Sequence, residues 1–274
     1  MTAEDSIPML DVILPQVGRI YRLILQACPR SFSSLLSEFS TPGRSLSSLT
    51  EASFSVDRLE IPDGGIYILG DRPLLCKLHI CLGGRRPDLL NAIRSLGISF
   101  PQLTELSLNT CSSPHAMLCI LKGTPNLIRF SIRFAQLGPN DDPAFDIVHP
   151  HLKILKLLSY APEELIGVLR HVTLPSLLEL YVSCPTIQAR RAPNVLPSEV
   201  LPLINRSSCN LTHLRLDGNI GPIVEQSHSS LVSFGTLLSA FPASMVQRII
   251  RRDVTLRHTS DNWLVCLIST LSRI

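Results

Sequence analysis

Aromatic and charged side chains are scarce in this chain, and its net charge is small. Of 274 residues, 5% are aromatic and 17% are charged, and the formal net charge is +3. Disordered chains combine low hydrophobicity with high charge, so this composition argues against disorder. The few positive charges are scattered, which gives no reason to expect binding to nucleic acid.

Several functional sequence signals are missing as well. The chain has no Gly-x-Ser-x-Gly, His-Glu-x-x-His or Walker motif, so we expect no enzymatic activity. Its longest apolar stretch, residues 263–268, is too short to span a membrane. Residues 1–6 are polar and acidic, unlike the start of a signal peptide. We therefore expect an intracellular protein, in the cytoplasm or the nucleus, without membrane contact.

The cysteines do not suggest a disulfide framework, because the eight of them are spread along the chain. With no secretory signal, we expect reduced thiols. Cys76, His79 and Cys81 are the nearest approach to a metal motif, but structural zinc needs four ligands and no second close-spaced pair is present. We expect no metal or cofactor. His149 and His151 flank a proline, and we expect a turn there with two solvated imidazoles.

Leucine is abundant, with 47 residues, and it recurs in a short phrase. The phrase has apolar residues at positions one, four and six, separated by variable ones. Its eight copies begin at Ile20, Leu49, Leu75, Leu103, Leu127, Leu152, Leu177 and Leu211. Successive copies start 24 to 34 residues apart, close to the period of roughly 20–29 residues that is typical of leucine-rich repeats.

The phrase predicts one strand in each repeat. Positions four and six alternate with positions three, five and seven, which is the period of a strand. We expect positions one, four and six to be interior and positions three, five and seven to be exposed. A proline precedes five of the strands, two residues before position one, and ends the preceding segment. These prolines are Pro73, Pro101, Pro125, Pro150 and Pro175.

Helical patterns follow several strands, marked by apolar spacing or by a proline and an early acid. We expect helices at residues 31–39, 86–96, 114–121, 162–171 and 197–205. Residues 188–194 predict an exposed loop. After the last phrase, residues 229–240 and 243–252 also have helical patterns, and a repeat array needs a terminal unit with a polar outer face.

Together these patterns predict an α/β leucine-rich-repeat solenoid, with a curved parallel sheet on the concave face and helices and irregular turns on the convex face. Residues 1–19 would form an N-terminal segment or cap, and residues 20–220 about eight irregular repeats. Residues 221–274 would form a C-terminal helical cap and tail, of which residues 254–274 have no clear pattern. Such arrays bind partners, and we expect a monomer.

The exposed strand positions are the candidate partner-binding site. Arg129, Arg133 and Lys156 would form a basic patch on neighbouring strands, with Leu158 and Tyr181 beside it as an apolar anchor. For any single position, an ordinary solvated strand residue is an equally good interpretation. The full candidate set is Lys77, His79, Glu105, Asn109, Arg129, Arg133, Lys156, Leu158, Glu179, Tyr181, His213 and Arg215.

Three segments carry a family resemblance. They are Phe-Pro-Gln-Leu-Thr-Glu-Leu-Ser-Leu at 100–108, Gly-Thr-Pro-Asn-Leu at 123–127 and Leu-Pro-Ser-Leu-Leu-Glu-Leu at 174–180. With them, the chain resembles the F-box and leucine-rich-repeat proteins of mushroom-forming fungi. Residues 14–23 are similar to that family's first strand, and the resemblance covers roughly residues 10–220.

The resemblance implies a role in protein degradation. In that family the F-box binds the Skp adaptor of a cullin ubiquitin ligase, and the repeats recruit substrates. For this chain the resemblance implies a protein substrate of unknown identity. Only 19 residues precede Ile20, fewer than an F-box occupies, so we expect contact with the adaptor only if an F-box is encoded upstream. The alternative is a free-standing leucine-rich-repeat scaffold or inhibitor that is not coupled to ubiquitination.

Overall fold

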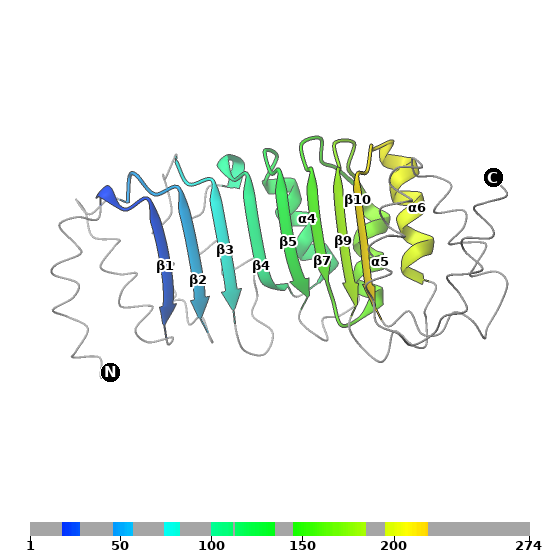
Figure 1. Ribbon diagram of the computed structural model, residues 1–274, viewed down its shortest axis with the longest axis horizontal. Helices are drawn as coiled ribbons and strands as arrows, with labels where there is room; N and C mark the ends of the chain where they lie inside the picture. Colours follow the sequence, from blue (N-terminus) through cyan, green and yellow to red (C-terminus); the bar gives the residue numbers. More distant parts are fainter. Residues whose placement is uncertain are drawn as a thin grey trace.

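The computed structural model describes the chain in seven segments, residues 18–27, 46–56, 74–82, 100–111, 113–134, 145–184 and 195–218. They form an α/β structure around one eight-stranded sheet (Figure 1). Its strands are β1 (Arg22–Ala27), β2 (Glu51–Val56), β3 (Lys77–Leu82), β4 (Glu105–Cys111), β5 (Arg129–Phe134), β7 (Ile154–Leu158), β9 (Glu179–Cys184) and β10 (His213–Gly218).

Each copy of the phrase forms one strand, and the strands lie side by side in the order of the chain. All neighbouring pairs are parallel, and position three of one strand is level with position three of the next, as in Arg22 opposite Glu51 and Glu51 opposite Lys77. Parallel neighbours require the chain to return outside the sheet between strands. The prediction of a parallel sheet built from successive phrases is therefore confirmed.

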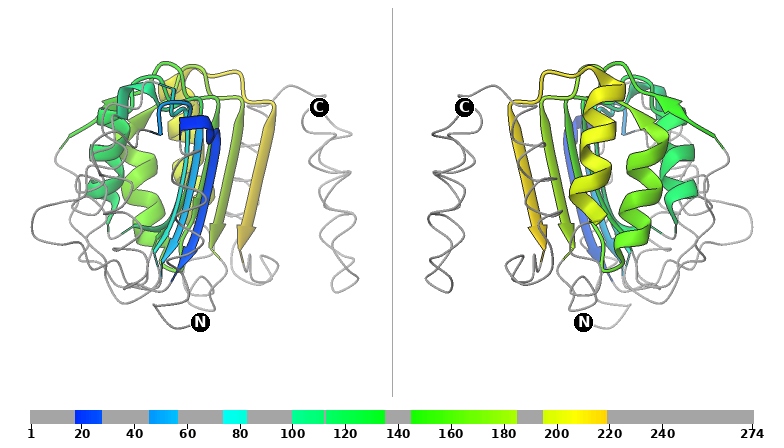
Figure 2. Two further views of the ribbon diagram at one scale, coloured as in Figure 1. Left: turned by 90° about the vertical axis from the view of Figure 1, so that its left-hand side faces the viewer. Right: turned by 90° about the vertical axis from the view of Figure 1, so that its right-hand side faces the viewer.

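Three helices lie on one side of the sheet, behind it in Figure 1 and to one side of it in both views of Figure 2. They are α4 (Pro114–Gly123), α5 (Pro162–His171) and α6 (Val195–Ser207), and they confirm the helices expected at 114–121, 162–171 and 197–205. The Ser113 hydroxyl accepts a hydrogen bond of 3.2 Å from the Ala116 amide, which caps α4. The helices expected at 31–39, 86–96, 229–240 and 243–252 fall outside the described residues.

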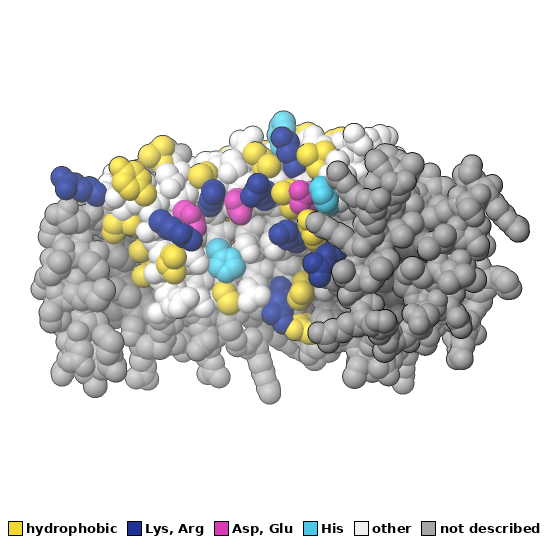
Figure 3. Space-filling model, viewed as in Figure 1, with side chains coloured by type: hydrophobic (Ala, Val, Ile, Leu, Met, Phe, Trp, Pro, Cys, Tyr) yellow, Lys and Arg dark blue, Asp and Glu magenta, His cyan; other side chains and the backbone are white. Residues whose placement is uncertain are grey.

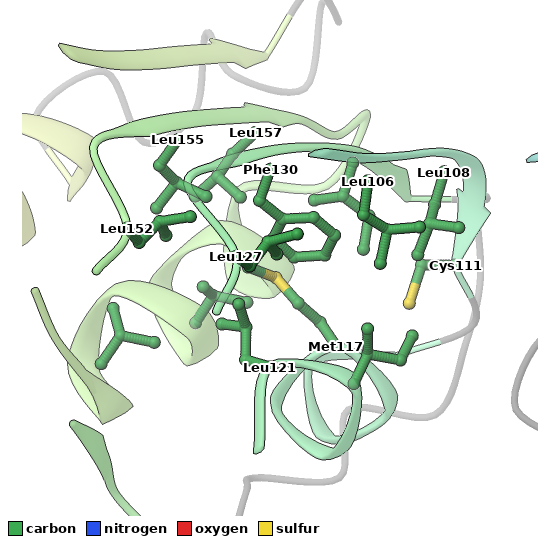
Figure 4. Close-up of a cluster of buried hydrophobic side chains, with 14 of the residues drawn as sticks. Leu106, Leu108, Cys111, Met117, Leu121, Leu127, Phe130, Leu152, Leu155 and Leu157 are labelled. Carbon is green, nitrogen blue, oxygen red and sulfur yellow. The ribbon is translucent and has the colours of Figure 1, made fainter. Parts of the chain in front are cut away.

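The core lies between the sheet and these helices. The side chains at position one are almost completely buried from Leu49 through Leu211, as predicted. Phe130 of β5 points from the sheet toward Met117 of α4 (Figure 4). Ile20 and Leu25 in the first described repeat are only half-buried, because β1 has a described neighbouring strand on one side alone.

The prolines before the strands occupy tight turns. In three of these turns the amide at position one donates to the carbonyl three residues earlier, for example Leu127 to Thr124 over 3.1 Å. Pro125 then stands at the second residue of a β-turn, where its fixed φ is favourable. Pro101, in the short 3-10 helix Phe100–Gln102, and Pro175 have the same arrangement. Pro73 is not among the described residues.

A main-chain ladder joins the repeats just before the strands. The carbonyl at position two of each described repeat except the last accepts two amide hydrogen bonds, from positions two and three of the next repeat. Thr104, for example, accepts from Ile128 at 2.8 Å and from Arg129 at 3.0 Å. Thr50, Cys76, Thr104 and Thr212 add a side-chain bond to the same carbonyl. Backbone groups at this edge are thus satisfied without a helix.

Behind the sheet, β6 (Ile147–Val148) and β8 (Val172–Thr173) pair as a second, two-stranded parallel sheet. Arg206 of α6 reaches back to this region. Its guanidinium donates to the carbonyl oxygens of Leu169 and Val172, both over 2.7 Å. Carbonyls in the last turn of a helix lack partners within it, so Arg206 satisfies the end of α5 from the following repeat.

His149 corrects one prediction. It lies in a turn with Pro150, as expected, but only 2% of it is exposed, so its imidazole is not solvated. Its Nε2 donates to the Thr124 carbonyl over 2.8 Å, and its Nδ1 has no partner among the described residues. Burial lowers the pKa of His149 below the ordinary 6.5; the bond to Thr124 opposes this shift and the charge of His151 adds to it. His151 is exposed, as predicted.

This burial predicts a pH dependence of stability. Above pH 6.5 His149 is neutral in the folded and unfolded states, so it adds no pH dependence. As the pH falls below 6.5, the unfolded histidine binds a proton and the folded one does not, so the free energy of unfolding falls until the lowered pKa is reached. His149→Gln should flatten this slope in urea unfolding curves measured between neutral and mildly acidic pH. His151→Gln should reduce the slope much less, because the charge of His151 is a smaller cause of the lowered His149 pKa than burial. Equal slopes in both variants would contradict the assignment.

The predicted N-terminal cap, apart from residues 18 and 19, and the C-terminal region from residue 221 onward lie outside the described residues, as does the loop at 188–194. Among the helices that the structure describes, none has the length and apolar character needed to cross a bilayer.

Candidate interaction surface on the sheet

The sheet surface opposite the helices is here called the front face, because it faces the viewer in Figure 1. It consists of positions three, five and seven of the strands, and all twelve candidate residues lie on it. None of the twelve is buried. Lys77, His79, Arg129, Lys156 and Arg215 are exposed, and the other seven are half-buried. The predicted alternation of interior and exposed positions is therefore confirmed from β2 to β9, whereas Leu25 of β1 is only half-buried.

Charges on the first four strands compensate one another. At position three, Arg22 pairs with Glu51 at 2.9 Å and Lys77 pairs with Glu105 at 4.0 Å. These side chains are largely exposed, so each pair contributes little stability. Their main effect is electrostatic, since each cation on this part of the face has an acidic neighbour on the next strand.

The cations on β5 and β7 have a different environment. The Arg133 guanidinium lies over the Tyr160 ring, 5.1 Å from its centroid, and donates a hydrogen bond to the Tyr160 hydroxyl. The Lys156 ammonium lies over the Tyr181 ring, also at 5.1 Å. Among the ion pairs of the described residues, none includes Arg129, Arg133 or Lys156. Cation–π contacts hold Arg133 and Lys156 in place without neutralising them.

The structure brings the predicted basic patch together with its apolar neighbours. Arg133 is level with Leu158 on β7, and Lys156 is level with Tyr181 on β9. Figure 3 shows several Lys and Arg side chains over this part of the face. The strand pattern assigns no role to Tyr160, because it follows the end of β7. The contact could have been suspected from the position of Tyr160, which comes just after the strand of the repeat that follows that of Arg133.

The remaining candidates lie on either side of this patch. Glu105 of β4 is level with Arg129. Lys77, His79 and Asn109 are on β3 and β4, where the Asn109 amide contacts the Cys81 sulfur at 2.9 Å. His213 and Arg215 are on β10, level with Glu179 and Tyr181 respectively. Glu179 accepts a hydrogen bond of 3.1 Å from the Tyr181 hydroxyl.

Metal-ligating residues do not gather in the described part of the chain. No group of three or more His, Cys, Asp or Glu side chains is close enough there to hold a metal ion. Cys76 instead donates through its thiol to the Thr50 carbonyl at 3.5 Å, while His79 is exposed on β3. The six described cysteines are free thiols.

One buried carboxyl lies outside the front face. Glu164, in the first turn of α5, is 4% exposed and accepts a hydrogen bond from the Ser159 hydroxyl. Burial raises the pKa of Glu164 above the ordinary 4.5, the Ser159 bond opposes that shift and the charge of Glu163 adds to it. The Ser159 oxygen also accepts from the Ala161 amide at 2.9 Å. Glu164 thereby helps to fix the turn that leads into α5.

The front face therefore offers an extended surface. Its β1–β4 part has paired opposite charges, and its β5–β9 part has two cations in contact with tyrosine rings. Such a surface can recognise a macromolecule through many weak contacts. No family model, curated protein or solved structure matches this chain, so its function has to be inferred from the arrangement of its side chains.

Proposed function

We propose that the chain is a leucine-rich-repeat solenoid whose concave face, the front face described above, binds another protein. The observation that carries this proposal is the row of in-register side chains across eight parallel strands. Repeat arrays of this kind present extended binding surfaces. Arginine and tyrosine, which dominate protein-binding hot spots, meet where Arg133 of β5 lies over Tyr160, just after β7, and Tyr181 of β9 lies under Lys156 beside them.

The rigidity of the cations supports this assignment. A free lysine or arginine loses side-chain entropy when it binds, which weakens the interaction. Tyr160 and Tyr181 already restrict Arg133 and Lys156 in the unbound protein. A partner can then use these charges at a smaller entropic cost. The chemistry of this surface fits binding without catalysis.

We further propose, from the family resemblance, that the bound protein is a substrate of a cullin-type ubiquitin ligase. The Skp adaptor would join the chain only if an F-box is encoded upstream. Affinity purification of the product of the full gene, followed by mass spectrometry, tests this coupling. Recovery of the adaptor and cullin together with a partner is expected. A partner that is recovered repeatedly without the adaptor would contradict the coupling and leave partner binding intact.

Charge reversal on the front face should abolish partner capture. Arg129→Glu with Arg133→Glu places two carboxylates where two cations stand, so an interface that uses this patch gains repulsion and loses attraction. The measurement is quantitative mass spectrometry of proteins captured by the variant and by the wild-type chain, each immobilised at the same density.

The matched control reverses two cations on the opposite side of the sheet, Lys122→Glu on α4 with Arg170→Glu on α5. It changes the net charge by the same amount and should leave capture unchanged. Thermal unfolding of all three proteins checks that they are folded. Capture that is unaffected by the front-face reversal, or equally affected by both reversals, would exclude the front face as the binding site.

A further inference from the structure

The two halves of the front face differ in charge balance. On β1 to β4, positions three, five and seven carry Arg22 and Lys77 against Glu51 and Glu105, and the two ion pairs join them. On β5, β7 and β9, the same positions carry Arg129, Arg133 and Lys156 against a single carboxylate, Glu179. Glu105 of β4 is level with Arg129, although no ion pair joins these two described residues. Arg133 is level with Leu158, and Lys156 is level with Ser131 and Tyr181. The second half therefore has an excess of positive charge, centred on Arg133 and Lys156.

From this imbalance we infer that the partner presents an acidic, extended protein segment to the β5–β9 half of the front face. The inference rests on the proposed binding function and specifies the chemistry of the partner at that site. Glu179 offsets only one of the three positive charges, and it lies at position three of β9, level with Ile154 rather than with a cation of the patch. The Glu179 carboxylate also accepts a hydrogen bond from the Tyr181 hydroxyl.

The positions of the cations specify a spacing. Arg129 and Arg133 lie at positions three and seven of β5, four residues and so about 13 Å apart along the strand. Lys156, at position five of β7, is level with Ser131 between them. The three cations thus form a staggered row along the strand direction. An extended segment that runs along β5 would place acidic side chains of alternate residues, which share one side, opposite this row.

Apolar neighbours distinguish this surface from a phosphate-backbone site. Ile154 and Leu158 are half-buried on β7, level with Arg129 and Arg133 respectively. A protein segment can place aliphatic side chains beside its carboxylates, whereas binding to a nucleic-acid backbone depends mainly on charge. These residues favour a peptide over a nucleic acid.

The test uses the full chain and two synthetic probes, a fluorescein-labelled hexapeptide of alternating Glu and Ser and the same peptide with Gln in place of Glu. Binding is measured by fluorescence anisotropy at about 20 mM and about 200 mM salt, because screening weakens exposed charge contacts. We expect the Glu peptide to bind, the Gln peptide to bind at least about tenfold more weakly, and the affinity for the Glu peptide to fall at the higher salt.

Two double variants locate the site. Arg129→Gln with Lys156→Gln should weaken binding of the Glu peptide by about tenfold or more. Arg22→Gln with Lys77→Gln removes one exposed arginine and one exposed lysine from the compensated half, with the same change in net charge, and should weaken binding by less than about twofold. Circular dichroism and thermal unfolding confirm that both variants are folded.

Three results would overturn the inference: equal affinity for the Glu and Gln peptides, equal losses in the two double variants, or tighter binding of a labelled oligouridylate than of the Glu peptide. The inference and the proposed function fail separately. If capture of the natural partner is lost on charge reversal but the Glu peptide neither binds nor competes, the front face binds a partner of different chemistry. If charge reversal does not alter capture, the proposed function fails first.

Discussion

Replacing Phe130 with alanine should lower the free energy of unfolding by about 3–5 kcal/mol, the usual cost of removing a buried aromatic side chain. Only 1% of Phe130 is exposed, and it is among the largest fully buried side chains of the described structure. It fills the space between β5 and α4, with Met117, Leu121 and Leu127 around it (Figure 4). Urea unfolding followed by far-UV circular dichroism measures the loss.

The size of this effect follows from the position of Phe130 in the array. Its ring bridges the sheet and the helix layer, so neighbouring repeats cannot fill the space without moving both layers. In a repeat array, each repeat is stabilised mainly by its neighbours. Weakening the repeat of β5 therefore also weakens its contacts with the repeats of β4 and β7.

Ser131→Ala is the matched control, because Ser131 is the next residue of β5 and points to the opposite face of the sheet. Ser131 is half-buried on the front face. A substitution there should change the free energy of unfolding by no more than about 0.5 kcal/mol. If Phe130→Ala and Ser131→Ala unfold at the same urea concentration, the assignment of core and front face along β5 is wrong.

The second large effect is expected at Arg206. Arg206→Met keeps most of the aliphatic stem but removes the guanidinium that donates to Leu169 and Val172. Hydrogen bonds from a charged group contribute about 1.5–3 kcal/mol each when buried, and these are only partly buried, so a total loss of about 1–3 kcal/mol is expected. The carbonyl groups of Leu169 and Val172 would then have only water as a replacement for the hydrogen bonds from Arg206.

Arg170→Met is the control for this change. Arg170 pairs with Glu199 at 2.6 Å, but 58% of its side chain is exposed, so its pair is screened by solvent. Its replacement should cost less than about 1 kcal/mol. Hydrogen exchange gives an independent readout, since Arg206→Met should accelerate exchange in the last turn of α5 and Arg170→Met should not. A smaller effect of Arg206→Met than of Arg170→Met would contradict the capping role.

The sequence pattern predicted the strands well because their alternation is a local property. Residues such as Leu127, Phe130 and Ile132 show their burial through spacing alone, and the in-register sheet follows from repeating that spacing. The helices with proline near the first turn were predictable for the same reason. Proline before position one was a sound signal, because its fixed φ suits the tight turn.

Contacts between repeats were much harder to predict. His149 looks like an ordinary turn residue until Thr124, 25 residues earlier, is placed beside it. Tyr160 and Arg206 likewise act on residues of another repeat, Arg133 and the end of α5. The residue spacing within one repeat does not indicate such partners, because they depend on how neighbouring repeats are aligned in space. The candidate patch was predicted from the alternation of side chains along the strands. The contacts of Arg133 with Tyr160 and of Lys156 with Tyr181 became visible only in the structure.

The ladder at position two has an evolutionary consequence. Its bonds join main-chain groups, so the eight residues at this position differ widely: Tyr21, Thr50, Cys76, Thr104, Ile128, Lys153, Leu178 and Thr212. Tyr21, Ile128 and Leu178 expose large apolar side chains there. Point mutations along this edge can therefore diversify its surface while the main-chain bonds between the repeats are kept. A lineage can change the surface chemistry of this edge without first acquiring compensating changes in the core.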